Sequence, residues 1–153
     1  MTRLQMRAFT VEDYLTLDAL EDEKLLRAGQ KVQRWAEVHL QAGPSATFTT
    51  PDGRIIFCGG VHDLWPHIGE IWGVFSKLAY YYPHTLQAVK WCIKELVEKM
   101  SYVRLQAIIV TANKTAIRFI EHLGFQKEGF MRYSGPHGED QFLYALIKGD
   151  NNG

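Results

Sequence analysis

Several side chains in this sequence have the chemistry that acid–base catalysis requires. Glu70 follows a turn at the start of a predicted strand. A partly buried carboxylate at that place could take a proton from a substrate ammonium group, whereas a solvent-exposed Glu70 would have no chemical role. His84 could contact a phosphate, act as a base, or only begin a helix. The three tyrosines at 80–82 could line a pocket or shield a sheet edge.

Metal and disulfide chemistry is not expected. His62, Asp63 and His67 superficially have the composition of a metal site, but they straddle a predicted turn and offer no Cys or Glu partner. We therefore predict that the protein holds no metal. Cys58 and Cys92 are far apart and lie in apolar surroundings, which predicts two buried free thiols.

Length and charge limit the class of protein. The 153 residues, 46% apolar and 22% charged, predict a single packed domain over 1–153 with a polar tail at 148–153. Seventeen Lys and Arg residues balance seventeen Asp and Glu residues, so we expect neither a nucleic-acid nor a membrane partner. No apolar run reaches the ~18 residues that cross a bilayer, and the start lacks the apolar core of a signal peptide. A cytoplasmic location is therefore expected.

The hydrophobic period changes several times along the chain, and each change indicates a new element. The predicted elements are a strand at 4–9, a short helix after a capping box at Thr10 and Asp13, a helix from Glu21 to Gly43 that includes Leu25 and Ala28, strands at 46–50, 54–61 and 69–76, a helix from about 84, a strand at 103–111, a helix from Asn113 to Gly124, and strands at 125–133 and 141–147.

This order is β-α-α-β-β-β-α-β-α-β-β. A meander followed by two helix crossovers predicts the α+β class with a mixed sheet. The strand at 103–111 is nearly all apolar, which favours a central strand covered on both faces. Trp35, Trp65 and Trp91 are predicted to be packing anchors, and Trp72 is either another anchor or a cleft residue.

One stretch of the sequence resembles a known family. Asn113, Ala116, the Leu-Gly-Phe run at 123–125 and the Glu-Gly pair at 128–129 resemble the C-terminal motif of the GCN5-related N-acetyltransferase (GNAT) superfamily. The opening at 7–13 is also similar to the start of many members. The resemblance covers roughly residues 4–148, and the predicted order of elements is that of the superfamily.

The resemblance implies a GNAT-like fold in which the fourth and fifth strands splay apart around acetyl-coenzyme A. Backbone groups of the fourth strand would bind the pantetheine arm and the thioester carbonyl, which implies Trp72, Gly73, Val74 and Phe75. The helix after the fifth strand flanks the coenzyme in the family. This implies contacts from Asn113 and Phe119.

The pyrophosphate loop departs from the family pattern. Members carry Gln or Arg-x-x-Gly-x-Gly or Ala there, and glycine lets the backbone approach phosphate closely. The segment 77–85 of this chain has no glycine, and Pro83 removes an N–H donor. Phosphate binding would fall to Lys77, His84, Thr85 and the tyrosine hydroxyls.

The catalytic pattern departs as well. Many members place a tyrosine acid four residues after the motif alanine, and Ile120 stands there in this chain. The resemblance makes Glu70 the general base. Tyr133, on the last hairpin, is either a substitute acid or a packing residue.

Two functions remain open. The first is an acetyltransferase that moves an acetyl group from acetyl-coenzyme A to a small-molecule or peptide amine. The second is a non-catalytic structural or interaction protein, because a glycine-free loop beside an intact C-terminal motif is similar to some phage and prophage proteins. The second function would imply a virion location and a virion partner. Homo-oligomerisation is compatible with either function.

Overall fold

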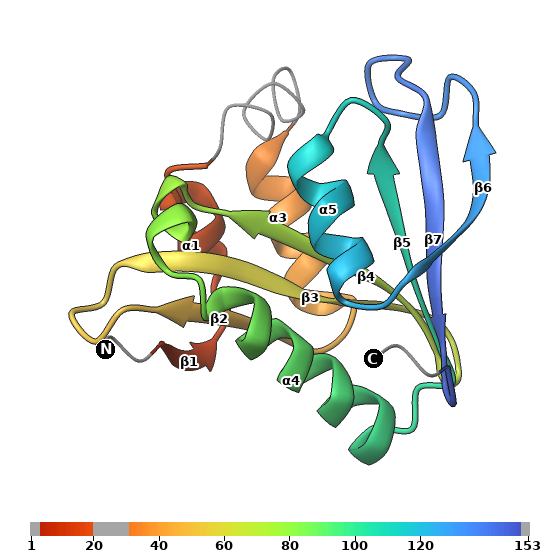
Figure 1. The fold of residues 1–153 in the computed structure, drawn as a ribbon. Coiled ribbons are helices and arrows are strands. Elements are labelled where there is room, and N and C mark those ends of the chain that lie inside the picture. Colours follow the sequence, from red (N-terminus) through yellow and green to blue (C-terminus); the bar gives the residue numbers. More distant parts are fainter. Residues whose placement is uncertain (1–3, 20–30, 151–153) are drawn as a thin grey trace. The chain divides into compact units, whose positions relative to one another are not determined.

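The computed structural model describes residues 4–19 and 31–150, apart from the side chain of residue 80. The predicted helical start at Glu21, with Leu25 and Ala28, lies outside the described residues. In chain order the elements are β1 (Gln5–Ala8), α1 (Val11–Thr16), α3 (Val32–Gln41), β2 (Ser45–Thr49), β3 (Ile55–Trp65), β4 (Ile68–Phe75), the 3₁₀ helix η1 (Lys77–Tyr81), α4 (Thr85–Lys99), β5 (Arg104–Val110), α5 (Lys114–His122), β6 (Gln126–Met131) and β7 (Gln141–Ile147) (Figure 1).

The strands form one mixed sheet, as the order of elements predicts. The strand order is β1-β2-β3-β4-β5-β7-β6. The pairs β1–β2, β2–β3, β5–β7 and β6–β7 are antiparallel, whereas β4 and β5 are parallel. The β4–β5 register joins Ile68 to Arg104, Gly69 to Leu105 and Glu70 to Gln106. The α+β class with a mixed sheet is therefore confirmed.

The chain divides into two compact units. One comprises residues up to His62 together with Ile71–Ala88, and the other comprises Asp63–Glu70 together with the chain from Val89 onward. The boundaries fall inside β3, β4 and α4, so these three elements belong to both units.

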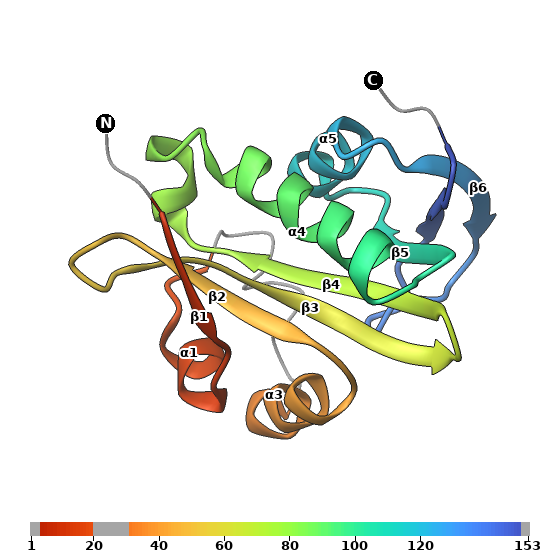
Figure 2. The same ribbon diagram turned by 90° about the horizontal axis from the view of Figure 1, so that it is seen from below.

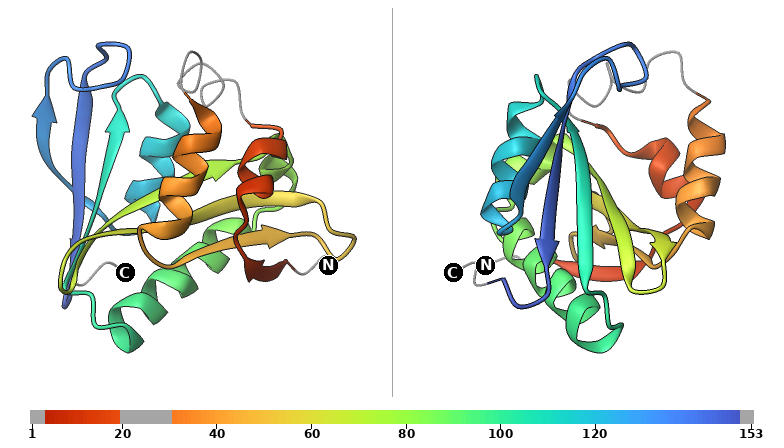
Figure 3. Two further views of the ribbon diagram at one scale, coloured as in Figure 1. Left: turned by 180° about the vertical axis from the view of Figure 1, so that it is seen from behind. Right: turned by 90° about the vertical axis from the view of Figure 1, so that its right-hand side faces the viewer.

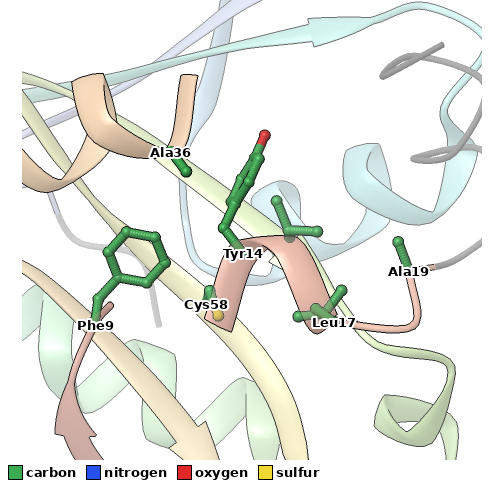
Figure 4. Packing of buried hydrophobic residues seen from close by; sticks show 7 residues of the cluster. Phe9, Tyr14, Leu17, Ala19, Ala36 and Cys58 are labelled. Atoms are coloured by element: carbon green, nitrogen blue, oxygen red, sulfur yellow. The ribbon is translucent and has the colours of Figure 1, made fainter. Parts of the chain in front are cut away.

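The first unit packs two helices on its strands. Figure 2 shows α1 and α3 on one face of β1, β2 and β3. The core between them consists of Phe9, Tyr14, Leu17, Ala19, Ala36, Cys58 and Val74 (Figure 4). The predicted capping box begins α1, because the Thr10 hydroxyl accepts the Asp13 N–H at 3.2 Å and the Asp13 carboxylate accepts the Thr10 N–H at 2.9 Å.

The second unit places α4 and α5 on one face of β5 and β7, as the right-hand view of Figure 3 shows. Asn113 caps α5 as predicted, since its side-chain oxygen accepts the Ala116 N–H at 3.2 Å. Gly124 ends the helix with φ 95°, a conformation that favours glycine. The motif at 113–125 therefore has a structural role, because its residues determine where α5 begins and ends.

Two packing predictions are wrong. The strand β5 is not covered on both faces: Leu105 and Ala107 are buried, but Ile108 is 38% exposed. The reason is that α4 and α5 cover only one face of this strand. Trp35, Trp65 and Trp91 are 46%, 72% and 54% exposed, so they are not packing anchors.

Local geometry explains these exposed tryptophans. Trp65 is the last residue of β3, beside the turn to β4. Trp91 lies two residues from both Val89 and Ile93, which are the buried hydrophobic positions of α4, so it points away from that face. None of the described helices is long and apolar enough to cross a membrane. Neither cysteine forms a disulfide within the described residues; Cys58 is buried as predicted, and Cys92 is only half-buried.

Candidate active site

The predicted pantetheine segment of β4 alternates between core and surface. Val74 is 4% exposed and belongs to the core of the first unit, whereas Gly73 is exposed. A Cβ at Gly73 would lie 2.7 Å from the ring of Phe57, so only glycine fits this close approach. The Phe75 ring also contacts the Phe57 ring, with the two centroids 4.9 Å apart and the planes tilted by 49°. The segment thus has an open main chain at Gly73 that a ligand can approach.

Trp72 is the centre of an aromatic cluster that also contains a histidine pair. The His39 ring stacks on Trp72 with centroids 4.1 Å apart and planes 13° apart. His39 Nδ1 lies 2.7 Å from His62 Nε2, so one ring donates a hydrogen to the other. Phe9 and Tyr14 contact Trp72 edge-on. The Trp72 indole Nε1 is buried and has no hydrogen-bond partner in the described part of the chain.

The predicted phosphate loop is folded as the helix η1, and its donors are largely occupied. Lys77 donates its backbone N–H to the Asp18 carbonyl at 2.9 Å, and its ammonium lies 3.9 Å from the Asp18 carboxylate. Thr85 is buried, and both its hydroxyl and its N–H donate to the Tyr82 carbonyl, at 2.7 and 3.0 Å. The backbone N–H groups of Leu86 and Gln87 lie in the first turn of α4, where an N–H group has no carbonyl acceptor within the helix.

The other polar residues of this loop face different surroundings. His84 Nδ1 lies 3.3 Å from the Gln87 side-chain oxygen. The Tyr82 hydroxyl accepts a hydrogen from Arg54 at 3.1 Å. Tyr81 is 78% exposed. The side chain of Tyr80 lies outside the described residues.

In the second unit, the predicted base Glu70 is held by a neighbouring strand. Glu70 pairs with Gln106 in the last described pair of the parallel β4–β5 register. The Gln106 amide donates to Glu70 Oε1 at 2.9 Å, in a part-buried position. Glu70 Oε2 makes no hydrogen bond within the residues that the structure describes. One oxygen is therefore fixed, and the other is available to a ligand.

The same polar chain continues to β6. Arg104 donates from Nε to the side-chain oxygen of Gln106 at 3.3 Å, and from both terminal nitrogens to Glu128 at 3.1 and 2.9 Å. This bidentate pair lowers the pKa of Glu128, chiefly through the hydrogen bond from Arg104. Glu70, Gln106, Arg104 and Glu128 thus form one connected set of side chains, which we call the polar chain.

Tyr133 lies in the turn between β6 and β7, not in a strand as predicted. It adopts φ 56° and is 83% exposed. The Asp140 carboxylate accepts its N–H at 2.9 Å, which holds this uncommon conformation. Its ring lies over Gly138, where a Cβ would be 2.9 Å from the ring. Tyr133 is therefore an exposed phenol on a constrained loop, and it is not a packing residue. A shallow depression beside it is lined by Phe130, Met131, Arg132, Tyr133 and Asp140.

The two predicted contacts after the fifth strand serve α5. Asn113 is 7% exposed, and its side-chain oxygen is occupied by the cap. Phe119 is half-buried in the middle of the helix. The cap gives Asn113 a structural role. The coenzyme contacts of both residues stay predictions.

The three residues that resemble metal ligands each have another partner. His62 bonds His39, Asp63 accepts the Tyr102 hydroxyl, and His67 Nδ1 lies 3.0 Å from the Ser101 carbonyl. Burial and this bond to Asp63 raise the pKa of Tyr102. Within residues 4–19 and 31–150 no group of three or more His, Cys, Asp or Glu side chains could hold a metal ion.

Neither the polar chain nor the histidine pair was predicted from the sequence. A signal for the first was present, because Arg104 and Gln106 alternate with Leu105 and Ala107 at the start of the apolar strand. No comparable signal marks His39 and His62, which are 23 residues apart and lie on different elements.

Comparison with solved structures identifies the fold as that of GNAT-family acetyltransferases. A GNAT-family acetyltransferase from Bacillus anthracis superposes with a TM-score of 0.75 at 19% identity, over 98% of this chain and 100% of that one. A ribosomal-protein-S5-alanine acetyltransferase from Vibrio fischeri gives a TM-score of 0.70 at 15% identity, over 98% of both chains.

A further similar structure is a chimera of the spermidine N-acetyltransferase SpeG from Vibrio cholerae. It gives a TM-score of 0.74 at 11% identity, over 94% of this chain and 95% of the chimera. No family model matches the sequence, and no curated protein matches it significantly. The likeness therefore establishes the fold.

Proposed function

We propose that this protein is an N-acyltransferase that moves an acetyl group from acetyl-coenzyme A to an amine. The observation that carries the proposal is the state of Glu70, whose carboxylate is part-buried, bound at one oxygen and available at the other. This is the arrangement that a general base requires, because it must accept a proton without rotating away. The fold shared with solved acetyltransferases supports the same assignment.

The chain offers fitting groups for the coenzyme. The exposed main chain at Gly73 lets a pantetheine arm approach β4, with Trp72, Val74 and Phe75 on either side. The pyrophosphate would use the leftover N–H groups of Leu86 and Gln87, where the helix dipole of α4 favours an anion. Lys77 and His84 would add their side chains. Thr85 would stabilise the turn without donating to phosphate, since its donors are occupied.

In the proposed reaction, Glu70 takes the proton from the attacking amine. The amine nitrogen forms a bond to the acetyl carbonyl carbon, and the carbon–sulfur bond breaks. The leaving thiolate then takes a proton, for which Tyr133 is the proposed donor, because its phenol is exposed and its backbone is constrained. The acceptor would be a small-molecule amine or a peptide amine.

Two measurements test this proposal. Calorimetry should detect acetyl-coenzyme A binding in the micromolar to millimolar range. Release of free thiol in the presence of a panel of amines should fall about 10²–10⁴-fold in Glu70→Gln. Glu12→Gln, on the exposed surface of α1, serves as the matched control. Full thiol release by Glu70→Gln would remove Glu70 from the mechanism.

A second candidate function is a non-catalytic structural or interaction protein. The observation that favours it is the pyrophosphate loop, which is folded as η1 with its Lys77 and Thr85 donors bound inside the chain. This alternative includes the finer resemblance to phage and prophage proteins, with a virion partner or a second copy of the chain. The absence of coenzyme binding at millimolar concentration would favour it over acyl transfer.

A further inference from the structure

The polar chain connects the proposed base to a charged pair on the far strand of the same unit. Gln106 on β5 donates to Glu70 on β4, Arg104 donates to Gln106, and Glu128 on β6 accepts two hydrogens from Arg104. Figure 1 shows β5, β7 and β6 side by side, so the polar chain runs across neighbouring strands of the sheet. All four residues lie within one compact unit.

The direction of these hydrogen bonds is determined by Arg104. A guanidinium can only donate, so the group of Gln106 that faces it must be the carbonyl oxygen. The amide nitrogen of Gln106 is then the group that faces Glu70, and it can only donate. Arg104 thereby selects the orientation of Gln106 that binds a carboxylate.

The charges along the polar chain explain why the Gln106 amide lies between Arg104 and Glu70. An arginine bound directly to Glu70 would stabilise the ionised carboxylate and make it a poorer base. Glu128 balances the charge of Arg104 through its two hydrogen bonds. The neutral Gln106 therefore orients the Glu70 carboxylate without bringing a charge beside it. The arrangement holds the carboxylate in place through a neutral donor.

We propose that Gln106, Arg104 and Glu128 are positioning residues, which hold Glu70 with Oε1 bound and Oε2 presented to the attacking amine. This inference rests on the proposed function, since it assigns Glu70 a reaction to serve. The other titratable groups of the β3–β4 turn have their own partners: Asp63 binds Tyr102, and His67 binds the Ser101 carbonyl. On β6, Lys127 lies over the Phe142 ring at 3.8 Å.

The test uses two substitutions with opposite electrostatic effects. Gln106→Glu places a second carboxylate beside Glu70, so protonation of Glu70 should begin at a higher pH. Glu128→Gln leaves the Arg104 cation unbalanced, so protonation should begin at a lower pH. A shift of about half a pH unit or more is expected in Gln106→Glu, where the new charge lies beside Glu70. A smaller shift in the opposite direction is expected in Glu128→Gln, because Arg104 and Gln106 lie between Glu128 and Glu70. The acid limb of the kcat/KM profile should move accordingly.

A neutral substitution tests orientation separately. Gln106→Leu should lower kcat about 10–100-fold through loss of orientation, while acetyl-coenzyme A affinity stays within about twofold. Gln126→Leu, an exposed glutamine on β6 outside the polar chain, is the matched control and should behave as the unaltered protein. A purely structural role would lower the thermal stability of Gln106→Leu and leave the kcat of the folded protein unchanged.

Carbon-13 NMR of the Glu70 carboxyl keeps this inference separable from the proposed function. Its titration midpoint should move up in Gln106→Glu and down in Glu128→Gln, whether or not any amine is acetylated. If the midpoints did not move, or moved in the same direction in both variants, the positioning role of the polar chain would be overturned. If the midpoints shifted as expected but the protein transferred no acetyl group, only the proposed function would be overturned.

Discussion

Both carboxylate oxygens of Asp13 accept a hydrogen from the guanidinium of Arg7, each at 2.7 Å. Asp13 is buried, and it also accepts the Thr47 hydroxyl at 2.8 Å and the Thr10 N–H at 2.9 Å. Burial, the largest single effect, raises the pKa of Asp13, but the bonds from Arg7, Thr10 and Thr47 together lower it to about 2. One side chain thus joins β1, α1 and β2.

Asp13→Asn should destabilise the protein by about 2 kcal/mol at pH 7, because the lowered pKa measures how much the fold favours the ionised form. The stabilisation is present above the ordinary aspartate pKa and is lost as the pH falls toward about 2. Urea denaturation at several pH values checks this, with Glu12→Gln as the control. Equal stability of Asp13→Asn and the unaltered protein at pH 7 would contradict it.

Gly73→Ala should destabilise the first unit by about 1–3 kcal/mol, because the new methyl group would lie 2.7 Å from the buried Phe57 ring. Chemical denaturation measures the loss. Adding Phe57→Leu should restore part of the stability, since it removes the ring that clashes. The control is Gly129→Ala, whose Cβ would meet only Leu143 at 4.0 Å. If the double variant were no more stable than Gly73→Ala, the clash would not be the cause.

His39→Phe should cost about 1 kcal/mol, because it keeps a ring stacked on Trp72 but removes the hydrogen bond to His62. His39→Ala should cost more, since the ring contact is also lost. Tryptophan fluorescence during urea unfolding reports both stability and the surroundings of Trp72. His122→Ala, on the exposed side of α5, should leave both unchanged. Identical losses in His39→Phe and His39→Ala would show that the stacking contributes nothing.

Tyr144→Phe should lower stability by about 1 kcal/mol at pH 8, because it removes the 2.8 Å hydrogen bond from the fully buried tyrosine to Glu121. Burial, with a further effect of this hydrogen bond, raises the pKa of Tyr144 to about 12. The stabilisation is complete below the ordinary tyrosine pKa near 10 and disappears as the pH rises through about 12.

Denaturation at alkaline pH measures this effect directly. The difference between the unaltered protein and Tyr144→Phe should be constant at neutral pH and should shrink between pH 10 and 12. Tyr81→Phe, at a 78% exposed position, should show no difference at any pH. A gap that stays constant up to pH 12 would contradict the assignment.

The features that could be predicted from the sequence are those set by neighbours along the chain. The capping box at Thr10 and Asp13, the Asn113 cap and the glycine after α5 are local signals, and each is confirmed. The bounds of β7 agree with the predicted range at 141–147. The α+β class followed from the order of these elements.

The features that could not be predicted depend on strand register, on weak local patterns, or on contacts between residues far apart in the sequence. An apolar run does not show which of its faces is covered, so the role of Arg104 and Gln106 depends on the pairing of β5 with β4. The helix η1 was also missed, since a short 3₁₀ turn has only a weak local pattern. The bond between His39 and His62 joins residues that no local rule connects.

The boundaries between the two compact units also bear on how this chain can be cut or extended. They fall after His62, Glu70 and Ala88, each inside a strand or helix and not in a linker. A fragment that ended at any of them would carry severed backbone hydrogen bonds, which are costly to leave unpaired. Insertions and new chain ends belong instead in exposed turns, such as the one around Gly53 between β2 and β3.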